Sequence, residues 1–200
     1  DEERVQILGD NCRKYKLPLF YVNQVGAQTE IIFDGGSLVF DDSGMLLDEM
    51  AYFSEDLKIY EFEDKKVKGF IPNVHDAQND IQQIHDALVL GIRDYFRKSG
   101  FSKAILGLSG GIDSALVCAL ASEALGPENV MAVLMPSEFS TDHSVQDALD
   151  LVKNLGCKHE IIPIREAASA FENIMKPVFK DLPFNVAEEN IQARSRAIIV

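Results

Sequence analysis

Residues 103–125 read KAILGLSGGIDSALVCALASEAL, and this stretch decides the fold of the second half of the chain. The run at residues 103–108 predicts a strand, and the segment from Ile112 to Leu125 predicts a helix. Because that helix is apolar almost all round, we expect it to be buried. Gly110 and Gly111 between the two elements indicate a tight turn.

The same alternation continues after this stretch. Strands are predicted at residues 129–135 and 159–164, and helices at 142–155 and 166–179. Strands and helices that alternate with short connections indicate an α/β fold with a doubly wound parallel sheet. Ligands of such sheets bind at the carboxyl ends of the strands, so we expect a site there.

The first 62 residues follow a different pattern. The spacing of Val5, Leu8, Cys12 and Tyr15 predicts an amphipathic helix over residues 1–16. Strands are expected after it, the first of them buried, at 19–22, 30–34, 37–41 and within 50–62. This β-rich segment is typical of part of a sandwich.

A change of pattern near residues 61–79 indicates a boundary. Residues 61–69 form a mixed charge run that we interpret as a solvated strand end and linker, and Pro72-Asn73 continues the loop. From residue 80 an amphipathic helix leads into the alternating part. The predicted organisation is therefore a first domain at 1–62, a linker at 63–79 and a second domain at 80–200.

The composition excludes several classes of protein. The chain has 200 residues, 46% hydrophobic, with a formal net charge of −13, which argues against a broad nucleic-acid surface. No apolar run reaches the roughly 18 residues of a membrane helix. The chain starts Asp-Glu-Glu-Arg, without Met or a signal-peptide pattern, so we expect the numbering to begin inside a longer protein.

The cysteines and histidines show no metal-binding or disulfide pattern. Cys12, Cys118 and Cys157 are widely spaced, which favours a reducing, cytoplasmic setting. Cys12 falls on the apolar face of its helix, so we expect it in the core. For His143, near the expected site, we predict solvent or capping contacts.

The loop Leu108-Ser-Gly-Gly-Ile-Asp-Ser114 is the most informative motif of the chain. Its glycines let consecutive amide groups point at one anion, and the helix dipole adds to the attraction. Ser109 and Ser114 can donate hydroxyl hydrogen bonds to phosphate, and Asp113 suits Mg²⁺ that bridges to the phosphates. One alternative is a plain tight turn with Ser109 as a helix cap. A Walker-type loop requires Gly-Lys-Ser/Thr, and no lysine is present.

The motif Ser-Gly-Gly-Ile-Asp-Ser resembles the pyrophosphate loop of N-type ATP pyrophosphatases. Residues 21–35, 131–144 and 188–194 extend this resemblance to the glutamine-dependent NAD synthetases over nearly the whole chain. The resemblance implies the C-terminal part of a nitrilase-like α/β sandwich, followed by the N-terminal part of an adenine-nucleotide α-hydrolase-like synthetase domain.

The resemblance also implies site residues. The ATP-binding residues would be Gly107, Leu108, Ser109, Gly110, Gly111, Ile112, Asp113, Ser114 and Met135, with Asp113 as a Mg²⁺ ligand. The residues that bind deamido-NAD would be Glu189, Asn190 and Arg194. An exposed, charged helix start is the structural alternative for this second set. Ser137, Ser140, Thr141 and Ser144 could contact nucleotide, and capping by Ser140 or Thr141 is the alternative for those two.

The chain departs from the family pattern in two respects. The family's glutaminase uses a Glu-Lys-Cys triad, whose cysteine would stand before the start of this chain, so we expect no glutaminase catalytic residue here. Residues 196–200 look like the start of a helix, and the synthetase domain should continue beyond them.

The resemblance implies an ATP-dependent ligase. The nicotinate carboxylate of deamido-NAD would attack the α-phosphorus of ATP to give an acyl-adenylate and pyrophosphate, and ammonia from glutamine would displace AMP. We expect a cytoplasmic homo-oligomer without nucleic-acid or membrane partners, and little activity from residues 1–200 alone. The alternatives are another N-type ATP pyrophosphatase, either an amidotransferase or a thiolase, and an inactive nucleotide-binding fragment.

The distribution of charge restricts how phosphate can be bound. No Lys or Arg lies between Lys103 and Lys153. Within that stretch, phosphate binding must rest on backbone amides, hydroxyls and Mg²⁺. A cationic side chain at the site has to come from elsewhere.

Overall fold

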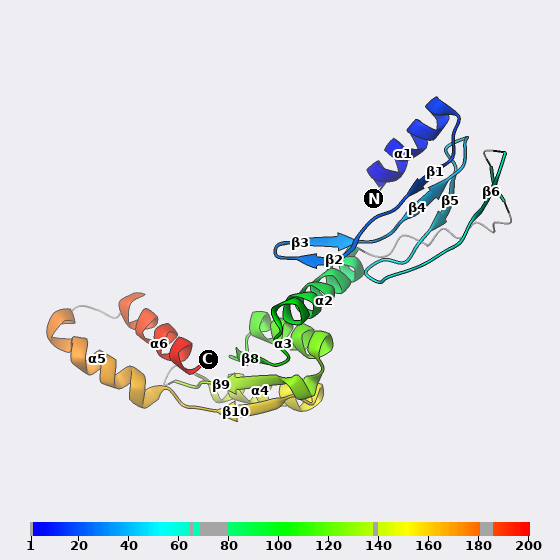
Figure 1. Cartoon of the computed structure of the whole chain (residues 1–200). Helices are drawn as coiled ribbons and strands as arrows, with labels where there is room; N and C mark the ends of the chain where they lie inside the picture. Colours follow the sequence, from blue (N-terminus) through cyan, green and yellow to red (C-terminus); the bar gives the residue numbers. More distant parts are fainter. Residues whose placement is uncertain (1, 65, 69–79, 138–139, 181–185) are drawn as a thin grey trace. The chain divides into compact units, whose positions relative to one another are not determined.

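The computed structural model describes residues 2–64, 66–68, 80–137, 140–180 and 186–200. The chain divides into two compact units, Asp1–Tyr95 (unit 1) and Phe96–Val200 (unit 2) (Figure 1). The division falls within helix α2, Asp80–Ser99. In the parts that the structure describes, no helix is both long and apolar enough to cross a membrane.

Unit 1 combines helix α1, Glu2–Tyr15, with short antiparallel strands. A three-stranded sheet has the order β1-β4-β5, formed by Leu19–Tyr21, Leu38–Phe40 and Leu46–Glu49. Two hairpins accompany it: β2–β3, formed by Val25–Gln28 and Ile31–Asp34, and β6–β7, formed by Glu61–Glu63 and Lys66–Lys68.

The core of unit 1 lies between α1 and the three-stranded sheet. Cys12 of α1 packs with Leu38 and Phe40, and Val5 and Leu8 complete the helix face. Cys12 is 2% exposed, so the predicted core role of this cysteine is confirmed. Burial, followed by the charge of Asp41, raises the pKa of its thiol, as expected for an inert core residue.

Several strand predictions in unit 1 are wrong in detail. The strand expected within 50–62 is limited to Glu61–Glu63, while β2 and β5 were not predicted at all. The β5 strand escapes the apolar pattern because it contains Asp48, which is 1% exposed and accepts hydrogen bonds from Lys58 and Tyr60. The β1 strand, expected to be buried, leaves Phe20 42% exposed.

The predicted linker is described only in part. Residues 69–79, including Pro72-Asn73, lie outside the described residues. The charge run before them is exposed, as expected, but it forms the β6–β7 hairpin rather than a single strand end. The domain boundaries stay predictions.

Unit 2 is built on a parallel sheet with the order β10-β9-β8. These strands are Lys158–Ile161, Val130–Leu134 and Ala104–Gly107. The connecting helices are α3, Ile112–Leu125, the 3-10 turn η1, Pro127–Asn129, and α4, Asp142–Leu155. Helices α5, Arg165–Phe179, and α6, Val186–Ile199, follow β10. The predicted α/β class with a parallel sheet is confirmed.

Strand β9 forms the centre of unit 2. Val130, Ala132 and Leu134 pack with Cys118 of α3 and Val152 of α4 in one cluster. The intervening residues of the strand face a second cluster, which contains Met131, Val133, Met135, Ile164 and Ile199. Because successive side chains of a strand point to opposite faces, β9 is covered on both sides, whereas all four residues of β10 are exposed.

Two predictions about helices of unit 2 need correction. The α3 helix is buried on one side only, since Ile112, Leu116 and Val117 are 81%, 55% and 53% exposed. Residues 196–199 are the last turn of α6 rather than the start of a helix. The helix begins ten residues earlier because it includes the charged segment 188–194.

Candidate functional site

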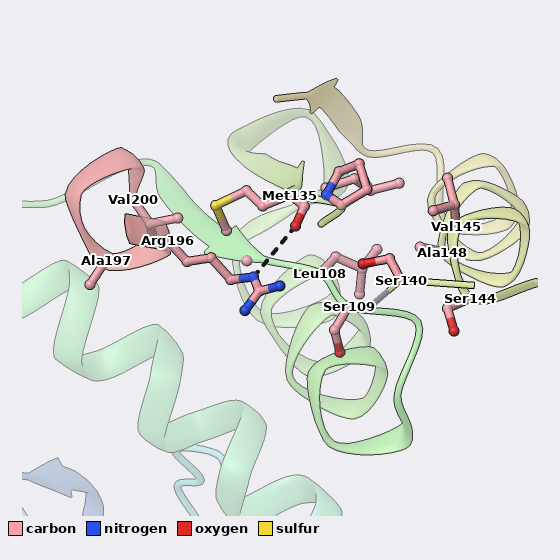
Figure 2. Close-up of a pocket in the computed structure, with 13 residues that line it drawn as sticks. Leu108, Ser109, Met135, Ser140, Ser144, Val145, Ala148, Arg196, Ala197 and Val200 are labelled. Carbon is pink, nitrogen blue, oxygen red and sulfur yellow. Dashed lines mark hydrogen bonds between the residues drawn. The ribbon is translucent and has the colours of Figure 1, made fainter. Parts of the chain in front are cut away.

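A cavity of about 470 Å³ opens at the carboxyl ends of β8 and β9. Figure 2 shows the thirteen residues that line it. They come from the end of β8, the end of β9, the start of α4 and the end of α6: Gly107, Leu108, Ser109, Leu134, Met135, Pro136, Ser140, Ser144, Val145, Ala148, Arg196, Ala197 and Val200. The cavity therefore lies where the sequence predicted a ligand site.

Backbone geometry holds the glycine loop between β8 and α3 in a tight turn. The Leu108 amide donates to the carbonyl of Val133 at 2.9 Å, which ties the loop to β9. Gly110 has φ +84°, and a Cβ there would lie 2.2 Å from the carbonyl oxygen of Ser144. Only glycine fits at this position without a backbone shift.

The serines of the loop hydrogen bond within the loop. The Ser109 and Ser114 hydroxyls lie 3.1 Å apart, and Ser109 Oγ accepts from the Gly111 amide at 3.2 Å. Ser114 Oγ accepts from the Ser109 amide and donates to the Gly111 carbonyl. The hydroxyls expected to meet phosphate thus also stabilise the loop through hydrogen bonds within it.

The N-terminus of α3 has no side-chain cap. Gly111 is the N-cap residue, so the alternative with Ser109 as helix cap is not the observed arrangement. An uncapped first turn leaves amide N–H groups without intrahelical partners, and these groups attract anions. Asp113 lies in this turn and is exposed.

The start of α4 borders the cavity and is capped. Thr141 is the N-cap residue, and its hydroxyl accepts from the Ser144 amide at 3.2 Å. Ser140 Oγ accepts from the Ser137 amide at 2.9 Å, so Ser140 stabilises the preceding turn. His143 is 86% exposed in its side chain and lies 3.3 Å from Asp147, in line with the expected solvent contacts.

Arg196 is the residue that sequence reasoning missed. Its Nε donates to the carbonyl oxygen of Met135, and its Nη2 donates to Ser137 Oγ, both at 3.4 Å. Arg196, Ala197 and Val200 all line the cavity, and Val200 follows the other two by four and three residues, the spacing of neighbours on a helix surface. The spacing was visible in the sequence. The position of Arg196 beside the end of β9 was not, because it depends on a contact with Met135, which is 61 residues away in the chain.

The structure brings together only some of the predicted site residues. Gly107, Leu108, Ser109 and Met135 line the cavity. The rest of the predicted phosphate loop, Gly110 to Ser114, lies directly beside it but is not part of its lining. Glu189, Asn190 and Arg194 are exposed on α6 and do not line the cavity either.

Comparisons with known proteins show what this chain is similar to. The NAD synthase family model matches residues 84–200. The glutamine-dependent NAD(+) synthetase of Synechocystis sp. is 46% identical over 199 residues, which cover 96% of this chain and 35% of that protein. The same enzyme of Acinetobacter baylyi is 38% identical over 201 residues, with 100% and 37% coverage.

Solved structures are similar as well. A glutamine-dependent NAD⁺ synthetase from Acinetobacter baumannii, solved with ADP, matches with a TM-score of 0.93 and 39% identity, covering 99% of this chain and 38% of that one. An NH₃-dependent NAD synthetase from Campylobacter jejuni matches 60% of this chain and 50% of its own, with a TM-score of 0.54 and 36% identity.

The chain spans about a third of the length of the curated relatives that it matches. The family model nevertheless covers more than half of the chain, including every residue that lines the cavity. The chain belongs to the NAD synthase family.

Proposed function

We propose that this chain supplies the ATP-binding part of a glutamine-hydrolysing NAD⁺ synthetase. The observation that carries the proposal is the cavity at the ends of β8 and β9, bordered by the Ser-Gly-Gly-Ile-Asp-Ser loop and the uncapped start of α3. A nucleotide in this cavity would place its base or ribose beside Met135 and its terminal phosphates at the amides of residues 110–114.

The protein's contribution to the reaction would be alignment and charge stabilisation. The carboxylate of deamido-NAD attacks the α-phosphorus of ATP, the bond to pyrophosphate breaks, and ammonia then displaces AMP from the acyl-adenylate. The loop amides would stabilise the charge that develops on the leaving pyrophosphate. The exposed face of α6 with Glu189, Asn190 and Arg194 is the proposed surface for deamido-NAD.

Mg²⁺ fits this donor set. Within the described residues no group of three or more His, Cys, Asp or Glu could hold a metal ion by itself. A site with one or two carboxylates plus substrate phosphates is what Mg²⁺ commonly uses, and Asp113 in the first turn of α3 would supply the carboxylate. When bound, Mg²⁺ would neutralise phosphate charge.

The proposal extends to the organisation of the enzyme. Residues 1–62 would belong to a nitrilase-like glutaminase domain, 63–79 to a linker and 80–200 to the synthetase domain. Glutamine would supply the ammonia, and the enzyme would be a cytoplasmic homo-oligomer. Cys12 is buried in the core of unit 1, so the nucleophile of glutamine hydrolysis would have to be a different residue.

One observation favours a second candidate for the chain by itself. Glu189, Asn190 and Arg194, the residues proposed for deamido-NAD, do not line the cavity, so residues 1–200 alone would bind nucleotide without turning it over.

A chimera tests the proposed function. This chain replaces the matching third of the Synechocystis relative, and AMP and pyrophosphate are measured with ATP, deamido-NAD, Mg²⁺ and glutamine or ammonium. We expect both products and NAD⁺. A chimera that folds and releases AMP only with another acceptor would contradict the assignment. The same chimera with Asp113→Ala should lose Mg²⁺-dependent turnover, and full retention would refute the metal role.

A further inference from the structure

Arg196 is the one charged side chain among the thirteen residues that line the cavity. It reaches the cavity from the last turn of α6. Figure 2 shows its guanidinium beside the carbonyl of Met135, facing the space between the end of β9 and Leu108 and Ser109. A cationic group therefore stands at the edge of a space that is otherwise lined by apolar and hydroxyl groups.

The hydrogen bonds of Arg196 leave part of its guanidinium available. The group has five N–H donors in a planar fork. Two of them meet Met135 O and Ser137 Oγ, both at the long distance of 3.4 Å. Among the described residues no carboxylate forms an ion pair with Arg196. The remaining N–H groups can bond to a bound molecule without breaking an existing ion pair.

The surrounding charge makes this position unusual. No Lys or Arg occurs between residues 103 and 153, and the chain carries a net charge of −13. Arg196 is half-buried and, within the part of the chain that the structure describes, has no carboxylate partner, so the N–H groups not bonded to Met135 and Ser137 can be satisfied by water or by an anion. The uncapped start of α3 adds partial positive charge close to the same cavity. Two separate elements thus favour an anion here.

We propose that Arg196 binds a phosphate group of the nucleotide in this cavity. The inference rests on the proposed function, because it takes the cavity as the ATP site. The contacts with Met135 and Ser137 would fix the plane of the guanidinium, so that its free N–H groups present a fork to phosphate oxygens. Arg196 would provide the cation that the central part of the sequence lacks.

A purely structural role is the competing explanation. Arg196 joins α6 to the end of β9, so its loss could loosen the cavity for any ligand. The two roles differ in how they depend on the ligand. A phosphate-binding residue matters only for ligands that carry phosphate, whereas a structural contact matters equally for the nucleoside.

Binding measurements on the 200-residue chain separate these roles. Arg196→Gln and Arg196→Lys are compared with Lys153→Gln, which removes the same charge from an exposed position of α4 outside the cavity. The probes are ATP, AMP, inorganic pyrophosphate and adenosine. Circular dichroism and urea unfolding verify that each variant is folded.

We expect Arg196→Gln to weaken ATP binding about 10- to 100-fold, the range for losing hydrogen bonds to a charged group. The affinity for adenosine should change less than about twofold in the same variant. Arg196→Lys should recover part of the lost ATP affinity, because lysine keeps the charge but not the planar fork of N–H groups. Lys153→Gln should bind all four probes as the unmodified chain does. Weaker binding of AMP by Arg196→Gln would assign the contact to the α-phosphate. Weaker binding of pyrophosphate alone would assign it to the terminal phosphates.

Equal losses for adenosine and ATP, or no loss for any phosphate, would overturn the role of Arg196. Failure of the proposed function gives a different result, since the unmodified chain would then bind neither ATP nor AMP. Binding of ATP by the unmodified chain therefore tests the proposed function, and the comparison among the variants tests the role of Arg196.

Discussion

Gly110 is the residue on which the shape of the proposed phosphate loop depends most directly. Its φ of +84° disfavours any side chain, and a Cβ there would also meet the backbone of Ser144 at 2.2 Å. Gly156 at the end of α4 has a similar φ of +75° but open space around the position of a Cβ. A comparison of substitutions at Gly110 and Gly156 therefore separates the cost of backbone strain from the cost of steric collision.

We predict that Gly156→Ala costs about 1–2 kcal/mol of unfolding free energy from left-handed strain alone. Gly110→Ala should cost more, because the loop or the start of α4 must move, and it should also weaken ATP binding. Urea unfolding and calorimetric titration with ATP measure the two effects. Equal stability losses for the two variants, with unchanged ATP affinity for Gly110→Ala, would show that the loop adapts.

Cys118 and Cys157 lie side by side in the core of unit 2, with their sulfurs 4.0 Å apart. Burial, together with the neighbouring Cys157, raises the pKa of the Cys118 thiol to about 11. Because the thiolate is the reactive form, little of it exists near pH 8.

We therefore predict that an aromatic disulfide reagent labels less than one thiol per native chain within minutes at pH 8. All three cysteines, including the buried Cys12, should react in guanidinium chloride. The measurement is the absorbance of the released thiolate. Rapid labelling of the native chain would mean that this core opens locally much more often than its burial indicates.

At the scale of elements, α4 illustrates how local sequence sets a boundary. Thr141 accepts a hydrogen bond from the Ser144 amide at the start of the helix, and Gly156 ends the helix with a left-handed residue. Thr141→Ala should lower the unfolding free energy by about 1 kcal/mol, while Thr141→Ser should keep most of it. Thermal unfolding of the two variants gives the comparison. If both variants lose the same amount, the methyl group of Thr141 matters rather than the cap.

The turn between β4 and β5 makes stability depend on pH. Burial favours the neutral form of Asp41, but bonds from the Ser43 hydroxyl and from the amides of Met45, Ser43 and Gly44 outweigh it and hold the pKa of the carboxyl below its usual value. A lowered pKa in the folded state stabilises the protein above the unfolded pKa of about 4, and that stabilisation disappears as the pH falls through the lower, folded value.

Asp41→Asn should therefore be less stable than the unmodified chain at pH 7. The difference should narrow below about pH 4 and approach a constant where Asp41 is protonated in both states. Urea midpoints measured from pH 7 to pH 2.5 test this sign. A difference that stays constant over the whole range would indicate that the charge of Asp41 contributes nothing.

Local patterns predicted the elements of unit 2 better than those of unit 1. Helices α3 and α4 have the predicted bounds, because their ends are marked by glycine and by a capping threonine. The β5 strand was missed because it contains the buried Asp48, whose partner Lys58 lies ten residues away and is partly buried. Such a pair reverses the rule that buried strand positions are apolar.

The site divides in the same way. The loop at residues 108–114 was predicted because consecutive residues carry its whole signal. Arg196 was not, because its place depends on how α6 packs on the far side of β9, where Ile199 joins Met135 and Val133. The α3 face with Leu116 was expected to be buried, since an apolar composition does not reveal which side of a helix the chain covers.

At the scale of the whole molecule, an acidic chain is proposed to bind a highly anionic ligand. The net charge is −13, and Asp113 stands in the first turn of α3 beside the phosphate loop. Without a divalent cation, this carboxylate would repel the terminal phosphates that the helix amides attract. If Mg²⁺ were bound there, the same carboxylate would be a metal ligand, so Asp113 would have opposite effects in the two conditions.

This reversal leads to a prediction about metal removal. For the unmodified chain, EDTA should weaken ATP binding about tenfold or more, the scale of one or two charge-assisted contacts. Asp113→Asn should bind ATP more weakly than the unmodified chain in Mg²⁺, but as well or better in EDTA, because the repulsion has been removed. Glu123→Gln near the other end of α3 removes the same charge and serves as the control. Calorimetric titrations in the two buffers measure all six affinities. If Asp113→Asn and Glu123→Gln respond alike, the effect belongs to the net charge of the chain. Suppose instead that only Asp113→Asn binds ATP more weakly than the unmodified chain in Mg²⁺ but as well or better in EDTA. A single carboxylate at the start of α3 then determines the metal dependence.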